Sequence, residues 1–244
     1  MTRITIPRAA KLAGATLLIL SLGGCPTFYN MGTAKTLAEG EMEFNATLVY
    51  NAISVEASGL SDDSNDAGAP DPAGDPKSSN ATDDTATATI AIPYIDFGYR
   101  YGIAENMDLG FGIKGFGRTS VDFKIGLVDT GMVGIAIDPE IGGLFLGVGD
   151  AAIGYLQFDL PILIDIRPND SLTITATLKY TGLMPFAGDE VALGHFIGGT
   201  IGVDIKIGDA FALHPFGGIT YVLDTPDNVE ATLPHGGLGI RMLL

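Results

Sequence analysis

Residues 95–114 read IDFGYRYGIAENMDLGFGIK, and their rhythm decides the fold. The first half places Ile95, Phe97 and Tyr99 at alternate positions, with a charged or small residue between each pair. After a break at 102–106 the same alternation resumes. A strand with one apolar and one polar face repeats with period 2, whereas an amphipathic helix repeats with period 3.6. The stretch therefore predicts a β-hairpin around a tight turn.

The same alternation recurs about ten times between Glu41 and Leu244. The predicted strands cover residues 41–54, 87–102, 107–117, 119–128, 131–146, 150–167, 171–182, 193–207, 210–223 and 232–244. The pattern of segment 131–146 is the weakest, because its alternation slips after Pro139-Glu140. A slip of this kind predicts a β-bulge at that point.

Long and short gaps between the predicted strands tend to alternate along the chain. The long gaps are 55–86, 183–192 and 224–231, and the clear tight turns are 102–106, 167–170 and 208–209. Outer-membrane barrels place long loops on one side of the bilayer and short turns on the other. We therefore expect residues 41–244 to form an all-β, antiparallel up-and-down transmembrane β-barrel of about ten strands. The acidic, Ser-, Asp- and Pro-rich segment 55–86 is expected to be a disordered surface loop.

The first 25 residues have the features of a secretory leader. Basic residues precede an apolar stretch, residues 12–22, that is shorter than the roughly 18 residues of a membrane-spanning helix. The stretch ends in Leu22-Gly23-Gly24-Cys25, which resembles a bacterial lipobox. We expect cleavage before Cys25, acylation of its thiol, and a periplasmic segment at 25–40. Cys25 is the only cysteine, so the chain forms no internal disulfide.

Charge excludes one class of partner. The net charge of the whole chain is −16, and loss of residues 1–24 removes three basic residues and no acidic one. The mature chain would then carry 29 acidic against 10 basic residues. This balance argues against nucleic acid as a partner.

The odd or even position of a residue in its strand, its parity, decides which face it occupies. By parity, many charged residues lie on the face opposite the Leu, Ile and Phe residues, toward a barrel lumen. The predicted lumen charges are Glu41, Glu43, Asp96, Arg100, Asp108, Lys114, Asp122, Lys124, Asp159, Asp165, Lys179, Asp204, Lys206 and Arg241. Both signs are present, and a ten-stranded barrel is narrow. We expect a largely plugged lumen of paired charges, with a narrow transport path as the alternative.

The run Arg100-Tyr101-Gly102-Ile103 through Asn106-Met107-Asp108-Leu109-Gly110, together with the lipobox and the alternating strands, resembles small outer-membrane β-barrel proteins. More narrowly, it is similar to the lipid-anchored barrel lipoproteins of Gram-negative bacteria. The resemblance implies an outer-membrane location with both termini in the periplasm. It also implies outer-membrane lipids and the barrel-insertion machinery as partners. One departure is the final residue, Leu244, where such barrels commonly end in Phe or Trp.

Nothing in the sequence indicates an enzyme. His195, His214 and His235 are the only histidines, and no nucleophilic Ser stands in a recognisable motif beside them. No metal or cofactor motif is present, so we expect a non-enzymatic envelope or surface component. A second hypothesis is a soluble, lipocalin-like periplasmic lipoprotein. In that fold the Leu, Ile and Phe face would line a pocket for an apolar ligand, and the charged face would meet water.

Overall fold

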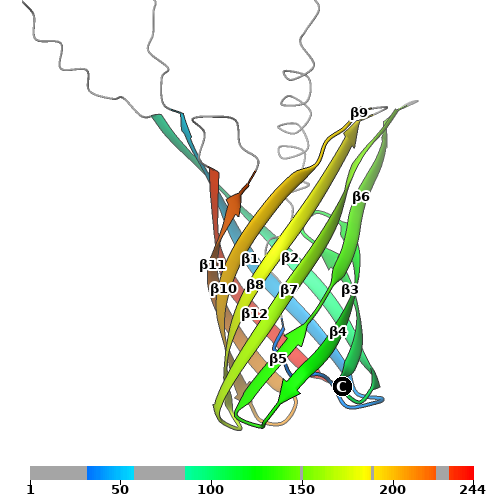
Figure 1. The fold of residues 1–244 in the computed structure, drawn as a ribbon, viewed down its shortest axis with the longest axis vertical. Helices are drawn as coiled ribbons and strands as arrows, with labels where there is room; N and C mark the ends of the chain where they lie inside the picture. The colour runs from blue at the N-terminus through cyan, green and yellow to red at the C-terminus, as the bar shows by residue number, and fades with distance from the viewer. Residues whose placement is uncertain (1–31, 58–85, 149–150, 188–189, 224–230) are drawn as a thin grey trace, which may run out of the picture.

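The computed structural model describes residues 32–57, 86–148, 151–187, 190–223 and 231–244. The expected signal peptide at 1–24, Cys25 and most of the long acidic loop lie outside these ranges. Within the described residues the chain forms twelve strands, which Figure 1 shows as a tilted barrel. They are β1 (Met42–Ala57), β2 (Ala86–Ala104), β3 (Met107–Lys114), β4 (Arg118–Asp129), β5 (Val133–Ile137), β6 (Glu140–Val148), β7 (Ala151–Asn169), β8 (Leu172–Ala187), β9 (Glu190–Val191), β10 (Gly194–Ile207), β11 (Phe211–Val222) and β12 (Ala231–Leu243).

The twelve strands occupy ten positions around one closed wall. Both β5 and β6 lie between β4 and β7, so together they fill a single position. The two-residue strand β9 extends the edge beside β8. Pairing of β7 with β8 and of β1 with β12 leaves no break in the ring, and every pairing is antiparallel. The prediction of a closed, antiparallel barrel of about ten strands is confirmed.

The two ends of the barrel differ in their connections. One end, called the turn end below, carries the short connections 105–106, 130–132, 170–171 and 208–210, together with the C-terminus (Figure 1). The opposite, loop end carries the connections that contain 58–85 and 224–230. The expected gap at 183–192 is wrong in part. Strand β8 continues through this region to Ala187, and Val191 of β9 pairs back onto Phe186.

The predicted slip at Pro139-Glu140 is also wrong. Strand β4 pairs Ile125 with Ile137 and Asp122 with Glu140. The two pairs are three residues apart on β4 and three residues apart across the interruption, so the register does not change. Strand β7 likewise keeps one register against β5 and β6. Side chains therefore alternate unchanged through positions 134–142. The bulge lies on β4 instead, between Gly126 and Val128.

Two prolines explain why pairing stops at 138–139. Pro139 lies in the interruption at 138–139, and Pro161 of β7 lies opposite the other residue of the interruption, Asp138. Proline has no backbone N–H to donate, and it is confined to edges or irregular points of a sheet. Neighbouring strands still use the carbonyl groups there. The amide of Phe123 donates to Pro139 O at 3.0 Å, and the amide of Asp138 donates to Pro161 O at 3.1 Å.

The outer surface of the wall is apolar. Large side chains point outward from every part of the ring, among them Phe97, Ile141, Leu178, Ile201 and Ile240, each 47–64% exposed. Polar and charged side chains of the opposite parity are buried inside. This arrangement contradicts the lipocalin-like hypothesis, which requires the apolar face inside. The described part of the chain has no helix with the length and apolar character that a membrane crossing requires.

Candidate functional site

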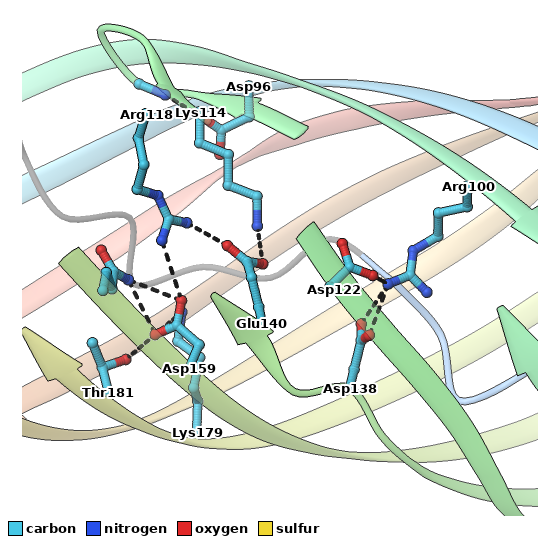
Figure 2. A network of polar contacts seen from close by, with 12 residues as sticks. Asp96, Arg100, Lys114, Arg118, Asp122, Asp138, Glu140, Asp159, Lys179 and Thr181 are labelled. Carbon is cyan, nitrogen blue, oxygen red and sulfur yellow. Dashed lines mark hydrogen bonds and ion pairs between the residues drawn. The ribbon is translucent and has the colours of Figure 1, made fainter. Parts of the chain in front are cut away.

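Charged side chains fill the lumen in three groups. The first, the Arg100 cluster, comprises Arg100, Asp108, Asp122, Lys124 and Asp138, from four neighbouring wall positions. The Arg100 guanidinium contacts Asp122 and reaches both Asp138 carboxylate oxygens at 2.8 Å (Figure 2). It also lies 3.4 Å from Asp108 Oδ2. Lys124 Nζ lies 3.2 Å from the same Asp108 oxygen. All five residues are buried, and each charge has a partner of opposite sign inside the protein.

Close approach of these groups requires a small residue on the adjacent strand. A Cβ built on Gly110 would lie 2.2 Å from Asp122 Oδ1, closer than real Cβ atoms come to any atom. Gly110 is paired with Asp122 across β3 and β4. Its missing side chain lets the Asp122 carboxylate lie flat along the wall toward Arg100. The inward glycines of the sequence thus make room for charges rather than for an open channel.

The second group, the Arg118 cluster, lies nearer the loop end and comprises Arg118, Lys114, Glu140, Asp159 and Lys179. Glu140 accepts from Arg118 Nη2 at 2.6 Å and is contacted by Lys114 Nζ. Asp159 lies 3.6 Å from Arg118 Nη1 and 3.9 Å from Lys179 Nζ (Figure 2). Four of the five are buried, and Lys114 is nearly so. Its charges come from five different strands, so the cluster ties opposite parts of the wall together.

Neutral groups complete the coordination of Asp159. Thr181 Oγ1 donates to it at 2.5 Å, and Gln157 Nε2 lies 2.9 Å from Oδ2. Beside the cluster, Asp96 accepts the amide of Gly115 at 2.6 Å and so holds the β3–β4 turn. A buried carboxylate surrounded by donors is stabilised in its charged form. This environment is suited to holding charge permanently rather than to moving it.

The third group, the Arg241 cluster, comprises Arg241, Glu43, Asp204 and His214 on the strands around the β1–β12 seam. Arg241 Nη1 donates to Glu43 Oε2 at 2.8 Å, and its Nε donates to Asp204 Oδ1 at 3.0 Å. His214 Nδ1 lies 3.5 Å from the same Asp204 oxygen. Strand β7 contributes a further charge, Asp165, which accepts from Thr175 Oγ1 at 2.8 Å. Together these groups place paired charge on all sides of the lumen.

The structure places most of the predicted lumen residues inside. The buried ones are Glu43, Asp96, Arg100, Asp108, Asp122, Lys124, Asp159, Asp165, Lys179 and Asp204. Lys114 and Arg241 are half-buried. Glu41 and Lys206 are exposed, and both line the same cavity as Arg100 and Lys124. Both lie at the turn end, where Glu41 precedes β1 and caps Ala38 N and Lys206 stands one residue from the end of β10.

Sequence reasoning missed three charged residues of the lumen. Arg118, Asp138 and Glu140 are each at most 2% exposed and take part in the clusters described above. Arg118 has the parity of Asp122 and Lys124, but it lay one residue outside the predicted strand. Asp138 and Glu140 have the parity of Gly134 and Ala136, and the supposed slip at Pro139 hid them. Continuing the even-numbered parity from 134 to 142 would have found both.

The chain before β1 also enters the lumen. A turn at 38–41, closed by the amide of Glu41 donating to Ala38 O at 3.0 Å, directs residues 32–37 inward from the turn end. Gly32, Thr33 and Ala34 are buried. Of the segment 25–40, which was expected to lie in the periplasm, the described part therefore runs from the turn end into the barrel.

The histidines occupy separate places. Tyr180 and His195 lie on the outward face, with Tyr180 Oη 2.6 Å from His195 Nδ1. His235 points inward, with Nε2 2.9 Å from Thr200 Oγ1 and Nδ1 3.2 Å from Leu233 O. The Thr200–His235 contact joins a hydroxyl to an imidazole nitrogen, and this imidazole is 6% exposed. Among the described residues no group of His, Cys, Asp and Glu is arranged to hold a metal ion.

No family model matches the chain, and no curated protein matches its sequence. Among solved structures, the outer membrane protease OmpT from Escherichia coli has a TM-score of 0.48 at 8% identity, over 87% of this chain and 100% of that one. Ail, the attachment invasion locus protein of Yersinia pestis, has a TM-score of 0.32 at 10% identity, over 83% and 99% of the two chains. The outer membrane protein OprG from Pseudomonas aeruginosa has a TM-score of 0.32 at 9% identity, over 87% and 99%. The likeness concerns the barrel fold alone.

Proposed function

We propose that this chain is a lipid-anchored outer-membrane barrel that acts as a non-enzymatic envelope or surface component with a closed lumen. The apolar outer wall supports insertion in a bilayer, because a band of exposed Ile, Leu and Phe side chains is stable in lipid and not in water. The asymmetry between turn end and loop end supports the outer membrane, with the turn end in the periplasm. The lipobox at Cys25 supports the anchor. Assembly would involve outer-membrane lipids and the barrel-insertion machinery.

Paired charge inside the barrel is the observation that carries the closed lumen. The Arg100 and Arg118 clusters contain ten charged side chains, and nine of them are buried. Burying an ion away from water costs several kcal/mol unless a partner compensates it. The pairs therefore hold one another in place across a lumen that is narrow at ten strands. A water-filled path would instead leave such side chains hydrated and exposed.

The contacts of the histidines support a non-enzymatic role. His235 is tied to a threonine and to a backbone carbonyl, and His214 stands beside an aspartate already paired with Arg241. A general base must also reach a nucleophile or a substrate proton within about 3 Å. His235 has such a hydroxyl in Thr200, but the imidazole is 6% exposed inside the wall, which leaves little room for a substrate.

Membrane insertion is tested with a Cys25→Ala variant exported by a conventional cleavable signal. Without the acyl chains, we expect the protein to remain in outer membranes after washing with urea or at alkaline pH. Retention would show that the strands themselves hold it there. Release would contradict the transmembrane placement and leave the lipid as the only attachment.

The closed lumen is tested in planar bilayers with the purified, folded protein. We expect no stable open level, while a general porin in the same bilayer shows its usual steps. A reproducible open level of this protein would contradict the closed lumen. It would favour the alternative of a narrow transporter.

A further inference from the structure

Residues Gly32–Leu37 climb the inner wall of the barrel in a definite order. Leu37 lies at the turn end, among residues such as Ala210 and Leu243. Thr36 lies beside Gly126, with its Cγ2 3.4 Å from a Cβ built on that glycine. Farther in, the amide of Lys35 donates to Asp165 at 3.3 Å, and Lys124 Nζ donates to Lys35 O at 3.1 Å.

Ala34 sits in a small apolar socket on the wall. It clusters with Ala136 and Leu163, which are both fully buried and are the apolar residues that β5 and β7 turn inward here. A Cβ built on Gly134 would lie in ordinary contact with the Ala34 Cβ, at 3.5 Å, but only 2.3 Å from Arg167 Nη2, so this glycine makes room for Arg167 beside the socket. The segment is thus bound by the Ala34 side chain in an apolar pocket and by two hydrogen bonds to the backbone of the next residue, Lys35. Bound peptides use the same combination of main-chain bonds for affinity and a pocket for one side chain.

The segment touches this wall and leaves space elsewhere. Two cavities, of about 160 and 490 Å³, open beside it at the turn end, and both are lined by Thr33, Lys35, Lys206 and Arg241. Ala34 lines neither cavity, because its side chain faces the socket. The segment therefore contacts the wall on one side and the two cavities on the other, with Thr33 and Ala34 buried and Lys35 exposed.

We propose that the socket formed by Gly134, Ala136, Leu163, Asp165 and Lys124 is a binding site for a short peptide that bends at a small side chain, as the chain does at Ala34. Residues 32–37 of the chain occupy it in cis, and a second peptide of the same character enters from the turn end when they leave. The inference rests on the proposed function, since the segment is part of what closes the lumen. The cis occupant competes strongly, because a short tether gives an effective concentration on the order of millimolar.

The test uses the buried Leu163 as a reporter. In the Cys25→Ala background, Leu163→Cys supplies the only thiol, and its labelling by a membrane-impermeant methanethiosulfonate is followed with time. Ala34→Phe is added to expel the segment, because a large ring has no room in the socket. Ala38→Phe is the matched control, since Ala38 is exposed in the turn outside it. The probe ligand is the capped hexapeptide Gly-Thr-Ala-Lys-Thr-Leu, and native folding of each variant is checked by heat-modifiable migration on gels.

We expect slow labelling in the Leu163→Cys protein and in its Ala38→Phe control, and about tenfold or faster labelling with Ala34→Phe. Millimolar hexapeptide should restore protection to the Ala34→Phe protein and leave the parent unchanged. Equal labelling in all three proteins would overturn the proposal. So would continued protection in a folded Ala34→Phe protein, or exposure that the peptide does not reverse.

Bilayer recordings of the same parent protein keep the two ideas separate. A parent that conducts contradicts the closed lumen, whatever the labelling shows. A silent parent with any of the overturning labelling results removes the peptide site and leaves the closed lumen intact.

Discussion

The Arg118 cluster and the socket of Ala34 lie in the same lumen and are built in opposite ways. The cluster joins charged side chains from five strands, with Glu140 held by two cations at once. The socket receives one methyl group and adds two hydrogen bonds, of 3.3 and 3.1 Å. One region is part of the wall itself, whereas the other holds a segment against the wall. The barrel is therefore closed by charges of its own wall and, under the peptide-site proposal, by a segment that can leave.

Their energies come from different interactions. Removing one partner from a buried ion pair costs about 3–5 kcal/mol, because the remaining charge stays buried without compensation. A hydrogen bond to a charged group contributes about 1.5–3 kcal/mol, and both bonds of the segment involve a charged side chain. The cluster joins strands of the wall to one another, whereas the bonds of the segment join only Lys35 to the wall.

Glu140→Gln should give the largest effect. It leaves Arg118 and Lys114 buried without their shared carboxylate, so we expect a loss of about 3–5 kcal/mol in the free energy of unfolding. Urea unfolding in lipid vesicles measures it. Lys206→Gln, at the exposed turn end, is the control and should change little. A loss below about 1 kcal/mol would mean that Glu140 is hydrated in solution and that the cluster is not closed.

Ile141→Arg tests the opposite face of the wall one residue away. Ile141 points outward and is 58% exposed. In lipid, an arginine on the outer face of a barrel costs about 2–4 kcal/mol near the midplane and less near the interfaces. Unfolding in vesicles should show a loss in this range, and Ile141→Val should show little. Equal stability of the arginine variant would place this face in water.

Gly110→Ala examines how tightly the Arg100 cluster is packed. The added methyl group would displace the Asp122 carboxylate from Arg100, so we expect a loss of about 1–3 kcal/mol. Gly147→Ala is a matched control, because a Cβ at Gly147 meets nothing within 4 Å. The unfolding midpoints of the two variants give the comparison. Equal unfolding midpoints of the two variants would mean that the Asp122 carboxylate can move aside and that the Arg100 cluster is loosely packed.

Asp129→Asn should have the smallest effect. Asp129 pairs with Arg167 Nη1 at 2.8 Å, but its side chain is 45% exposed at the turn end. Exposed pairs contribute about 0–1 kcal/mol and weaken with salt. Unfolding at low and high ionic strength should show a small loss that fades as salt rises. A loss as large as that of Glu140→Gln would erase the distinction between the rim and the buried clusters.

Alternation in the sequence predicts the barrel and most of its inward charges, because parity is a local property of each strand. Pairing is not local. Arg118, Glu140 and Asp159 meet because Asp122 stands opposite Glu140, and Glu140 stands opposite Asp159. That register depends on how neighbouring strands align. One sequence shows which charges face the lumen, but not which of them become partners.

The segment 32–37 could not be found in this way. Gly-Thr-Ala-Lys-Thr-Leu has no alternation and no strong charge pattern. Its place inside the barrel depends on contacts with Gly134, Ala136 and Leu163, which are about a hundred residues or more away in the chain. The alternation of a strand shows that these residues face inward, but not that they receive another segment. Asp138 was hidden for a different reason. Pro139 was interpreted as a point where the alternation of inward and outward side chains shifts by one residue. It only removes a backbone donor, and the strand keeps its register.

The seam between β1 and β12 has a consequence for the order of folding. It pairs Glu43 with Leu243, and the amide of Leu244 donates to Met42 O at 2.9 Å. Contacts so distant along the chain are the slowest to form and cost the most loop entropy. Every other junction of the ring joins strands that are much closer in sequence. The wall therefore has no closed precursor, and an emerging chain remains an open, two-edged sheet until its last strand has arrived.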